Sequence, residues 1–458
     1  MTHGEIDTAT AHAWAALGGP AEPLKAVSYT PSRRVLPARL PVRELARATV
    51  GACALAAAEL GARRSGGAAA EVRVDEGAVA TAFLSERHLR IDGRKPTSFA
   101  PLSGFWRAAD GWVRTHANYP HHRARLLAAL GLPDEGDTDT SVERLSAELA
   151  TRPARSIQET VYAAGGLAVA VPEPDASEIP PTGLPLIESR RLGEGAPCRL
   201  PHGPLPASGV RVLDLTRVLA GPVATRTLAL LGADVLRVDS PRLPEDPDTH
   251  ADTGFGKRST RLDLADPADR RTFDDLLARA DVVVSGYRPG ALDRYGLTPD
   301  DLLARHPGIV LAQVCAWGWS GPWAARRGFD SLVQAATGIA AIEAGPDGRP
   351  GVLPAQALDH GTGYLIAAAV LRALTERHET GGGRHLRFSL AGTASWLMHG
   401  ITPAPEGGAA YDPEPHLAET PSPYGPLRHA RSPITYDGRP LDWPRPPAQW
   451  GTDTAAWL

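Results

Sequence analysis

The chain has 458 residues, enough for two or three domains. It carries 48 basic and 52 acidic residues, for a formal net charge of −4, and this near balance argues against the strongly basic face that nucleic-acid binding needs. A hydrophobic content of 43% is ample for packed cores. Because Cys53, Cys198 and Cys315 lie far apart, we expect neither a disulfide framework nor a structural zinc site.

The N-terminal residues show no basic segment followed by an apolar run, so the sequence predicts no signal peptide. The longest apolar stretches, near residues 52–60 and 365–374, are shorter than a bilayer-spanning helix requires. We therefore expect a soluble, cytoplasmic protein with no membrane contact and no nucleic-acid partner.

Along the first 200 residues we expect an extension over 1–40 and a unit over 41–200. The second of these is predicted to contain a helix over 50–64, a strand over 71–74, two short strands around Asp110, and helices over 141–150 and 156–164. The composition predicts a smaller α+β domain here. Residues 172–206 are rich in Pro and Gly, which is typical of a linker.

Residues 203–320 alternate between short β-rich runs and amphipathic stretches. Strands are predicted over 210–215, 234–238, 281–285 and 309–314, with helices over 224–231, 267–280 and 299–305 between them. This alternation predicts an α/β fold with a Rossmann-like parallel sheet and helices on both faces. A helix over 362–377 and a strand over 385–390 complete a large domain over 203–400, and the Pro-rich residues 401–458 are expected to form a strap over the surface.

A partial internal repeat relates the two units. The helix and strand predicted at 50–74 align with those at 362–390, after a gap of two residues. In this alignment Asp359 corresponds to Arg47, so only one copy carries a carboxylate.

Several familiar motifs are incomplete in this chain. The strand at 210–215 and the acidic Asp239 are typical of dinucleotide binding, but the turn reads TRVLAGP and lacks GxGxxG, which disfavours a nicotinamide enzyme. Residues 254–260 have the wrong spacing for a P-loop, and we interpret them as a solvated loop. His121 and His122 have no third ligand at a useful spacing, so we expect surface positions and no metal site.

Asp359 stands where an apolar run gives way to a predicted helix. The ordinary interpretation is a helix N-cap. The alternative is a catalytic carboxylate, since a helix N-terminus favours the ionised form, which is the nucleophilic form. Gly361 and Gly363 are predicted to leave room beside it for a large substrate.

Residues 209–400 resemble the family III CoA-transferases of the CaiB/BaiF type, which include carnitine CoA-transferases and acyl-CoA racemases. The matching motifs are GVRVLDLTRVLAGP (209–222), LGADVLRV (231–238), GKRS (256–259), LDL (262–264), YRPGALDRYG (287–296), GWSGP (318–322) and LDHGTG (358–363). Residues 45–200 resemble the part of the family that follows the catalytic helix. The chain therefore looks like a rearranged member with a truncated first copy.

The resemblance implies CoA transfer from an acyl-CoA to a carboxylic acid, with Asp359 forming an aspartyl anhydride and then an aspartyl-CoA thioester. It implies a homodimer that uses CoA esters as substrates and holds no permanently bound cofactor. The residues implied to contact CoA are Val218, Ala220, Leu262, Leu264, Gly286 and Tyr287, with Arg294 and Arg327 at its phosphates.

Three points leave alternatives open. Ser240 and Ala265 stand where family members often carry basic residues, and Arg242 or Arg258 are the candidates to replace them. Phe329 stands where the racemases carry His, which disfavours a 2-methylacyl-CoA racemase, the second hypothesis. A degenerate, non-catalytic CoA-binding protein is the third.

Overall fold

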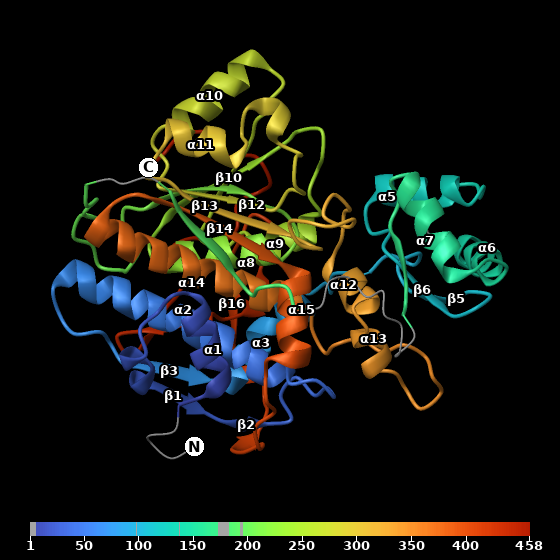
Figure 1. Cartoon of the computed structure of the whole chain (residues 1–458), viewed down its shortest axis with the longest axis horizontal. Helices are drawn as coiled ribbons and strands as arrows, with labels where there is room; N and C mark the ends of the chain where they lie inside the picture. The colour runs from blue at the N-terminus through green and yellow to red at the C-terminus, as the bar shows by residue number, and fades with distance from the viewer. Residues whose placement is uncertain (1–5, 98, 137, 173–182, 193–195) are drawn as a thin grey trace.

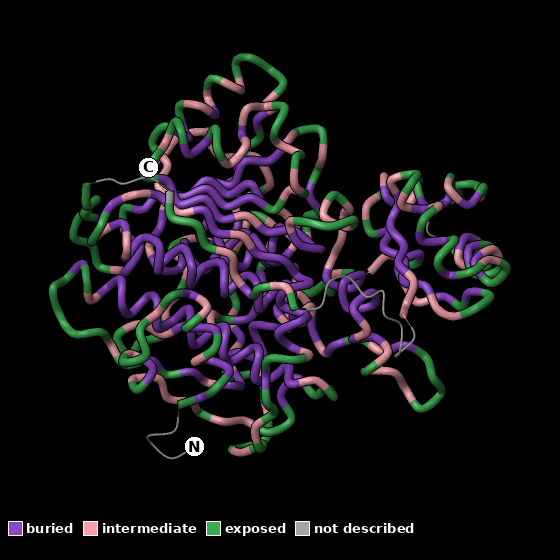
Figure 2. The backbone as a smooth tube through the Cα atoms, in the orientation of Figure 1, coloured by how far each residue is buried: buried purple, intermediate pink, exposed green. Residues whose placement is uncertain are grey.

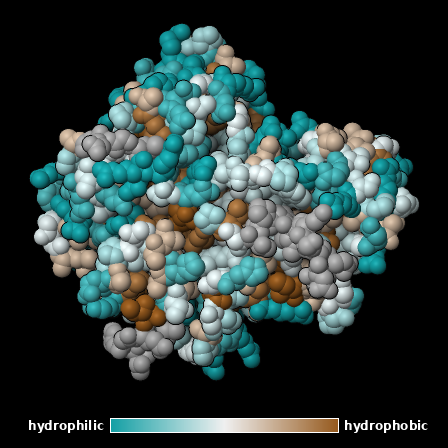
Figure 3. Space-filling model, viewed as in Figure 1, coloured by the Kyte–Doolittle hydropathy of each residue, from teal (hydrophilic) through white to brown (hydrophobic). Residues whose placement is uncertain are grey.

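The computed structural model describes residues 6–97, 99–136, 138–172, 183–192 and 196–458. Figure 1 shows a body built around one large sheet, and a smaller lobe of helices and short strands beside it. Burial is concentrated in the sheet and in two long helices below it (Figure 2). On the face drawn in Figure 3, hydrophobic residues form small patches among hydrophilic ones.

The large sheet has seven strands, in the order β11-β10-β9-β12-β13-β14-β8. Their bounds are Arg258–Arg261 (β11), Asp234–Asp239 (β10), Arg211–Leu215 (β9), Val282–Ser285 (β12), Val310–Cys315 (β13), Gly383–Ser389 (β14) and Glu188–Leu192 (β8). All neighbours pair in parallel except β8, which runs antiparallel to β14. The prediction of a linker over 172–206 was therefore wrong at β8, a polar strand that closes one edge of the sheet.

Helices cover both faces of this sheet, as the alternating pattern predicted. In Figure 1, α10 (Pro267–Leu277) and α11 (Pro299–Arg305) lie on one side, and α8 (Ala220–Leu230) and α14 (Ala357–Thr380) on the other. The strands are accordingly apolar on both faces; β12, for example, is buried at every position. The predicted α/β class with a mostly parallel sheet is confirmed.

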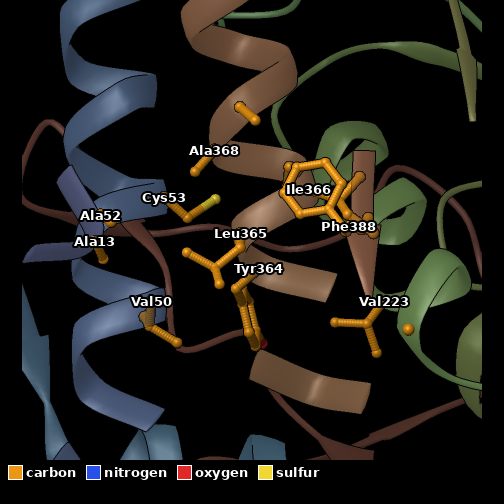
Figure 4. Packing of buried hydrophobic residues seen from close by; sticks show 14 of the residues in the cluster. Ala13, Val50, Ala52, Cys53, Val223, Tyr364, Leu365, Ile366, Ala368 and Phe388 are labelled. Atoms are coloured by element: carbon orange, nitrogen blue, oxygen red, sulfur yellow. The ribbon is translucent and has the colours of Figure 1, made fainter. Parts of the chain in front are cut away.

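Two helices of 24 residues pack against each other below the sheet: α2 (Val42–Ser65) and α14. Figure 4 shows Cys53 of α2 facing Leu365 of α14 in their contact. By length and composition alone, α2 is long and apolar enough to cross a membrane, but 94% of its most apolar window is buried inside the protein. The helix is longer than the apolar stretch expected over 52–60 because it also contains buried charged residues that form ion pairs, such as Arg47 with Glu76.

The repeat continues beyond these helices. After α2 come β3 (Val72–Asp75) and α3 (Glu76–Phe83), and after α14 come β14 and α15 (Leu390–His399). Asp75 and Ser389 cap the two short helices through their side chains. Because Asp359 and Glu44 are each the third residue of their long helix, the helix starts match Asp359 with Glu44, three residues before the Arg47 of the sequence alignment.

The smaller lobe has its own core, formed by residues such as Leu126, Leu145 and Ile157. Its antiparallel sheet contains β5 (Phe105–Arg107), β6 (Trp112–Thr115) and β7 (Ala168–Ala170), packed with α5 (Pro120–Ala129), α6 (Asp139–Ala150) and α7 (Ala154–Ala163). These elements include the strands predicted around Asp110 and the helices predicted over 141–150 and 156–164, whereas α2, β3 and α3 pack in the core of the body. Helices α12 (Asp330–Ala336) and α13 (Ile339–Ile342) lie between the lobe and the body (Figure 1).

Short elements tie the N-terminal residues to the C-terminal ones. Strand β17 (Leu427–Ala430) pairs with both β16 (Leu417–Thr420) and β4 (Arg90–Ile91), and β15 (Ala409–Ala410) pairs with β2 (Ser32–Arg33). The other elements are α1 (Thr8–Ala16), η1 (Glu22–Ala26), β1 (Val27–Thr30), α4 (Ser85–His88), α9 (Pro247–Thr253), η2 (Asp293–Tyr295), η3 (Glu414–His416), β18 (Thr435–Tyr436) and β19 (Arg439–Pro440).

The last twenty residues are fastened to the body through indole N–H groups. Trp443 donates to the carbonyl of Arg226, and Trp450 donates at 2.9 Å to Oδ2 of Asp239. Trp457 donates to the carbonyl of Leu276. The domain limits expected from composition stay a prediction.

Candidate active site at Asp359

Asp359 is the third residue of α14, in its first turn. The helix begins five residues before the predicted start, and its N-cap is Gln356, so the interpretation of Asp359 as the N-cap was wrong. The backbone N–H of Asp359 donates a 2.9 Å hydrogen bond to Oδ2 of Asp330, at the start of α12. Asp330 therefore supplies an acceptor at this helix start, and the carboxyl group of Asp359 is left for other partners.

The turn between β9 and α8 lies against the Asp359 carboxyl group. The backbone N–H of Ala220, the first residue of α8, favours the charged form of this carboxyl group and lowers its pKa. Two residues earlier, Val218 has a φ of 69°, which a β-branched residue rarely adopts. Strain of this kind costs ~1–3 kcal/mol and is often found at functional sites.

The two glycines that follow Asp359 are packing contacts. A Cβ on Gly361 would lie 2.8 Å from Cδ2 of Leu45, and one on Gly363 would lie 2.7 Å from the carbonyl oxygen of Ala220. They let α14 approach α2 and α8 closely. The prediction that they leave room for a substrate was wrong, because neighbouring helices occupy that space.

Burial dominates the electrostatics of Asp359, which is 7% exposed. Burial and the nearby charges of Asp330 and Glu86 raise its pKa well above the usual value, and the Ala220 N–H acts in the opposite direction. Burial likewise raises the pKa of Asp330 to about 6. The helix N-terminus is expected to favour the ionised form of Asp359, but burial and the two neighbouring carboxylates act against the helix dipole and raise the pKa.

A buried imidazole is next to Asp359 in sequence. His360 is fully buried, stacks on Phe83 with ring centroids 5.2 Å apart, and has Nε2 3.3 Å from Oε2 of Glu86. Burial would raise the pKa of Glu86, but the hydrogen bond and charge of His360 outweigh it and hold that pKa below its usual value. Glu86 is therefore an ionised carboxylate beside the site.

The expected CoA contacts gather mostly at the carboxyl edge of the large sheet. Val218 and Ala220 follow β9, and Gly286 and Tyr287 follow β12. Chain order reverses between these two adjacent strands, with β10 and β11 on one side and β13 on the other. In open α/β sheets, ligands bind at such a crevice.

Leu262 and Leu264 follow β11 at the same edge, but Leu262 is a core residue packed with Val238. Arg242 forms an ion pair with Asp263 beside them, so it lies at this edge. Arg258 instead pairs with Asp234 at the start of β10, on the far side of the sheet. Arg242 thus remains a candidate replacement for the missing basic residues, and Arg258 does not.

The two arginines expected at the phosphates are placed differently. Arg294 is exposed, and its guanidinium stacks on Tyr295 at 4.7 Å. Arg327 lines a pocket of about 360 Å³ together with Arg288 and Arg326. Desolvation and the charges of Arg288 and Arg125 lower the pKa of Arg327, so this pocket carries excess positive charge.

The structure also corrects two expectations of surface exposure. Lys257, in the supposed solvated loop, is buried; its Nζ lies 3.0 Å from Oδ2 of Asp214 and 2.9 Å from the carbonyl of Pro222. His122 is buried as well, because its ring lies against Tyr119 and Phe329. Phe329 stacks on His116 at 3.8 Å, so its position is filled by an aromatic stack.

The sequence analysis did not single out Asp330, Glu86, Arg288 or Arg326. Asp330 stood in the Gly-Phe-Asp segment considered only for its missing histidine. Glu86 lies 274 residues from His360, and no local pattern links them. Arg288 stood inside the matched motif at 287–296 and Arg326 stood directly before the candidate Arg327, but neither was assigned a role.

The chain was compared with families and proteins of known description. Residues 207–431 match the model of CoA-transferase family III. An acetyl-coenzyme A transferase of Hypoxylon pulicicidum is 33% identical over 328 residues, covering 66% of this chain and 55% of the relative. A probable fatty acyl-CoA transferase of Mycobacterium tuberculosis is 36% identical over 189 residues, covering 38% of this chain and 48% of the relative.

Among solved structures, a CAIB/BAIF family protein from Brucella suis is 29% identical, with a TM-score of 0.40, over 48% of this chain and 65% of that one. The chain thus spans about half the length of the curated relatives it matches. The motifs of the β9–α8 turn and of the Asp359 helix both lie within the matched region, and on this evidence the chain belongs, through residues 207–431, to CoA-transferase family III.

Proposed function

We propose that this protein transfers CoA from an acyl-CoA to a carboxylic acid, with Asp359 as the catalytic nucleophile. The observation that carries the proposal is the meeting of the Asp359 carboxyl group with the Ala220 N–H, in the turn that ends β9. This turn is also where the CoA crevice of the sheet begins. A nucleophile and a backbone donor thus adjoin the crevice, as acyl transfer requires.

In the proposed reaction a carboxylate oxygen of Asp359 attacks the acyl carbonyl carbon, the C–S bond breaks, and CoA leaves as a thiolate. The thiolate then attacks the aspartyl carbonyl of the anhydride, giving an aspartyl-CoA thioester and the free acid of the donor. The acceptor carboxylate repeats these two steps in reverse order, so that it leaves as its CoA ester and Asp359 returns as a carboxylate.

Each step exchanges one activated acyl bond for another, so the site must hold the thiolate close and keep water from the anhydride. The burial of Asp359 serves the second need. The Ala220 N–H is positioned to stabilise charge on the aspartyl oxygen. The pocket at Arg288 and Arg327, in which Arg326 is paired with Glu159, supports binding of the CoA phosphates.

Trapping of the thioester tests the proposal. The protein is incubated with acetyl-CoA or succinyl-CoA, and intact-mass and peptide analysis should find CoA attached at Asp359. Borohydride should reduce the adduct, and Asp359→Asn should form none. Absence of any adduct with either donor, in protein shown to bind CoA, would refute the transferase and favour the non-catalytic hypothesis.

The racemase alternative is tested in D2O by following deuterium uptake at Cα of a 2-methylacyl-CoA incubated with the same protein. The homodimer and the cytoplasmic location stay predictions, tested by solution mass and by fractionation.

A further inference from the structure

Glu86 reaches the Asp359 site from the N-terminal half of the chain. It lies in α4, and the residue before it is fixed to the other half: Oγ of Ser85 donates at 2.7 Å to Oδ2 of Asp252. Arg226 of α8 donates to the carbonyl oxygen of Asp252 at 3.0 Å and to Oγ of Ser85 at 3.4 Å. The position of Glu86 is therefore set by a buried polar network.

His360 completes the attachment. Its Nε2 is 3.3 Å from Oε2 of Glu86, its ring stacks on Phe83 of the same half, and its backbone continues directly from Asp359. Phe83 also stacks on Tyr364, one turn further along α14. Phe83 and Glu86 therefore both contact the first two turns of α14.

The charges around Asp359 come from three elements. Asp330 of α12 accepts from the Asp359 N–H, Glu86 comes from α4, and His360 comes from α14 itself. The α8 residue in contact is Ala220, which offers only its backbone N–H. On α2, Arg47 forms ion pairs with Asp7 and Glu76. The carboxyl groups of Asp359 and Asp330 are therefore buried at the start of α14, and the Glu86 side chain, 20% exposed, is held beside them by His360.

We propose that Glu86 is a positioning residue of the Asp359 site: its carboxylate, fixed at 3.3 Å from Nε2 of the adjacent His360, holds a negative charge at the start of α14 and so governs when the nucleophile is formed. Like charges in a buried cluster cannot all ionise freely. The attacking carboxylate of one half is thus controlled by a charge from the other half. The inference rests on the proposed function, because it concerns the same nucleophile.

The test is the pH profile of CoA attachment to Asp359 in single turnover with acetyl-CoA and succinyl-CoA. In Glu86→Gln the midpoint of the profile moves to lower pH, by roughly one unit on the scale expected for a nearby like charge. Glu86→Asp keeps the charge and should keep the midpoint. The matched control is Glu59→Gln, which removes another carboxylate that joins the halves, paired with Arg372 thirteen residues along α14; its midpoint stays that of the wild type.

A merely structural role predicts a slower reaction at every pH with an unmoved midpoint, and that result would overturn the inference. If the wild type forms no adduct at all, the proposed function fails and a second measurement still decides the inference. The difference in unfolding free energy between wild type and Asp359→Asn is followed against pH, since it reports the titration of Asp359. The same difference measured in the Glu86→Gln background should occur at lower pH, and an unchanged window would refute the role of Glu86.

Discussion

The backbone N–H of Asp359 donates a hydrogen bond to the carboxylate of Asp330, while the charge of that carboxylate raises the pKa of the Asp359 carboxyl group. One bond holds the start of α14 in place and also brings a negative charge beside the nucleophile. The hydrogen bond stabilises the start of the helix, whereas the Asp330 charge opposes the ionisation of Asp359. The protein thus trades stability for a buried carboxyl group, because the folded state loses stability when Asp359 ionises.

That trade predicts how stability depends on pH. The pKa of Asp359 is raised in the folded state, so the folded protein binds more protons than the unfolded one, and stability falls as pH rises from about 4 through that raised value. Asp359→Asn lacks this titration and should gain stability over the wild type as pH increases. At pH 8 we expect a gain on the order of 1 kcal/mol or more, which should be absent at pH 4.

Urea unfolding at both pH values measures this gain. The control is Asp300→Asn, which changes an exposed aspartate of α11 and should alter neither value. A gap between wild type and Asp359→Asn that does not vary with pH would contradict the raised pKa.

Gly363→Ala tests the contact between α14 and α8. The new Cβ would lie 2.7 Å from the Ala220 carbonyl oxygen and 2.8 Å from Cβ of Val223. We expect a loss of about 1–3 kcal/mol from overpacking, and slower CoA attachment because the Ala220 N–H moves. Gly308→Ala, where the added Cβ meets nothing within 4 Å, should change neither the unfolding curve nor the rate.

Lys257 should be important for stability. Its ammonium group is buried against Asp214, and burial lowers its pKa to about 8 although the Asp214 charge acts against this. Lys257→Met leaves Asp214 without its cation, which typically costs about 3–5 kcal/mol. Adding Asp214→Asn should recover part of the loss, and a double variant less stable than the single one would contradict the pairing.

Ligand binding separates the two arginines proposed for the phosphates. Arg327→Ala should weaken CoA binding about tenfold, the scale of one charge-assisted hydrogen bond. Arg294→Ala, at an exposed position stacked on Tyr295, should change it little. Calorimetric titration with CoA and dephospho-CoA at two salt concentrations measures both. A larger effect at Arg294 would place the phosphates outside the pocket at Arg288.

Much of the sheet could be predicted because its strands are short apolar runs bounded by Gly, Pro or Asp. Strand β12, for instance, begins one residue from its predicted limit. Strand β8 could not be predicted from the sequence, because ESRRL is polar and forms a strand only by pairing with the edge of β14. The early start of α14 was not predicted because glycine disfavours helix locally. Gly361 and Gly363 are explained only by the close tertiary contacts with Leu45 and Ala220.

The position of Asp359 as the candidate residue came from its motif, and its surroundings required the structure. Glu86 and His360 meet across 274 residues, and no periodicity carries such information. The electrostatics of the carboxyl group also required the structure, because a helix dipole is visible in sequence whereas desolvation and neighbouring charges depend on packing.

The pairing of α2 with α14 has a consequence for how the molecule could be divided. The two helices pack along each other, so a polypeptide ending near residue 172 and one beginning near residue 183 would each expose an apolar helix face. Produced together they should recombine, and acyl-CoA chemistry would then report reassembly. In such a split protein the environment proposed to control the Asp359 carboxylate would form only when the two polypeptides associate.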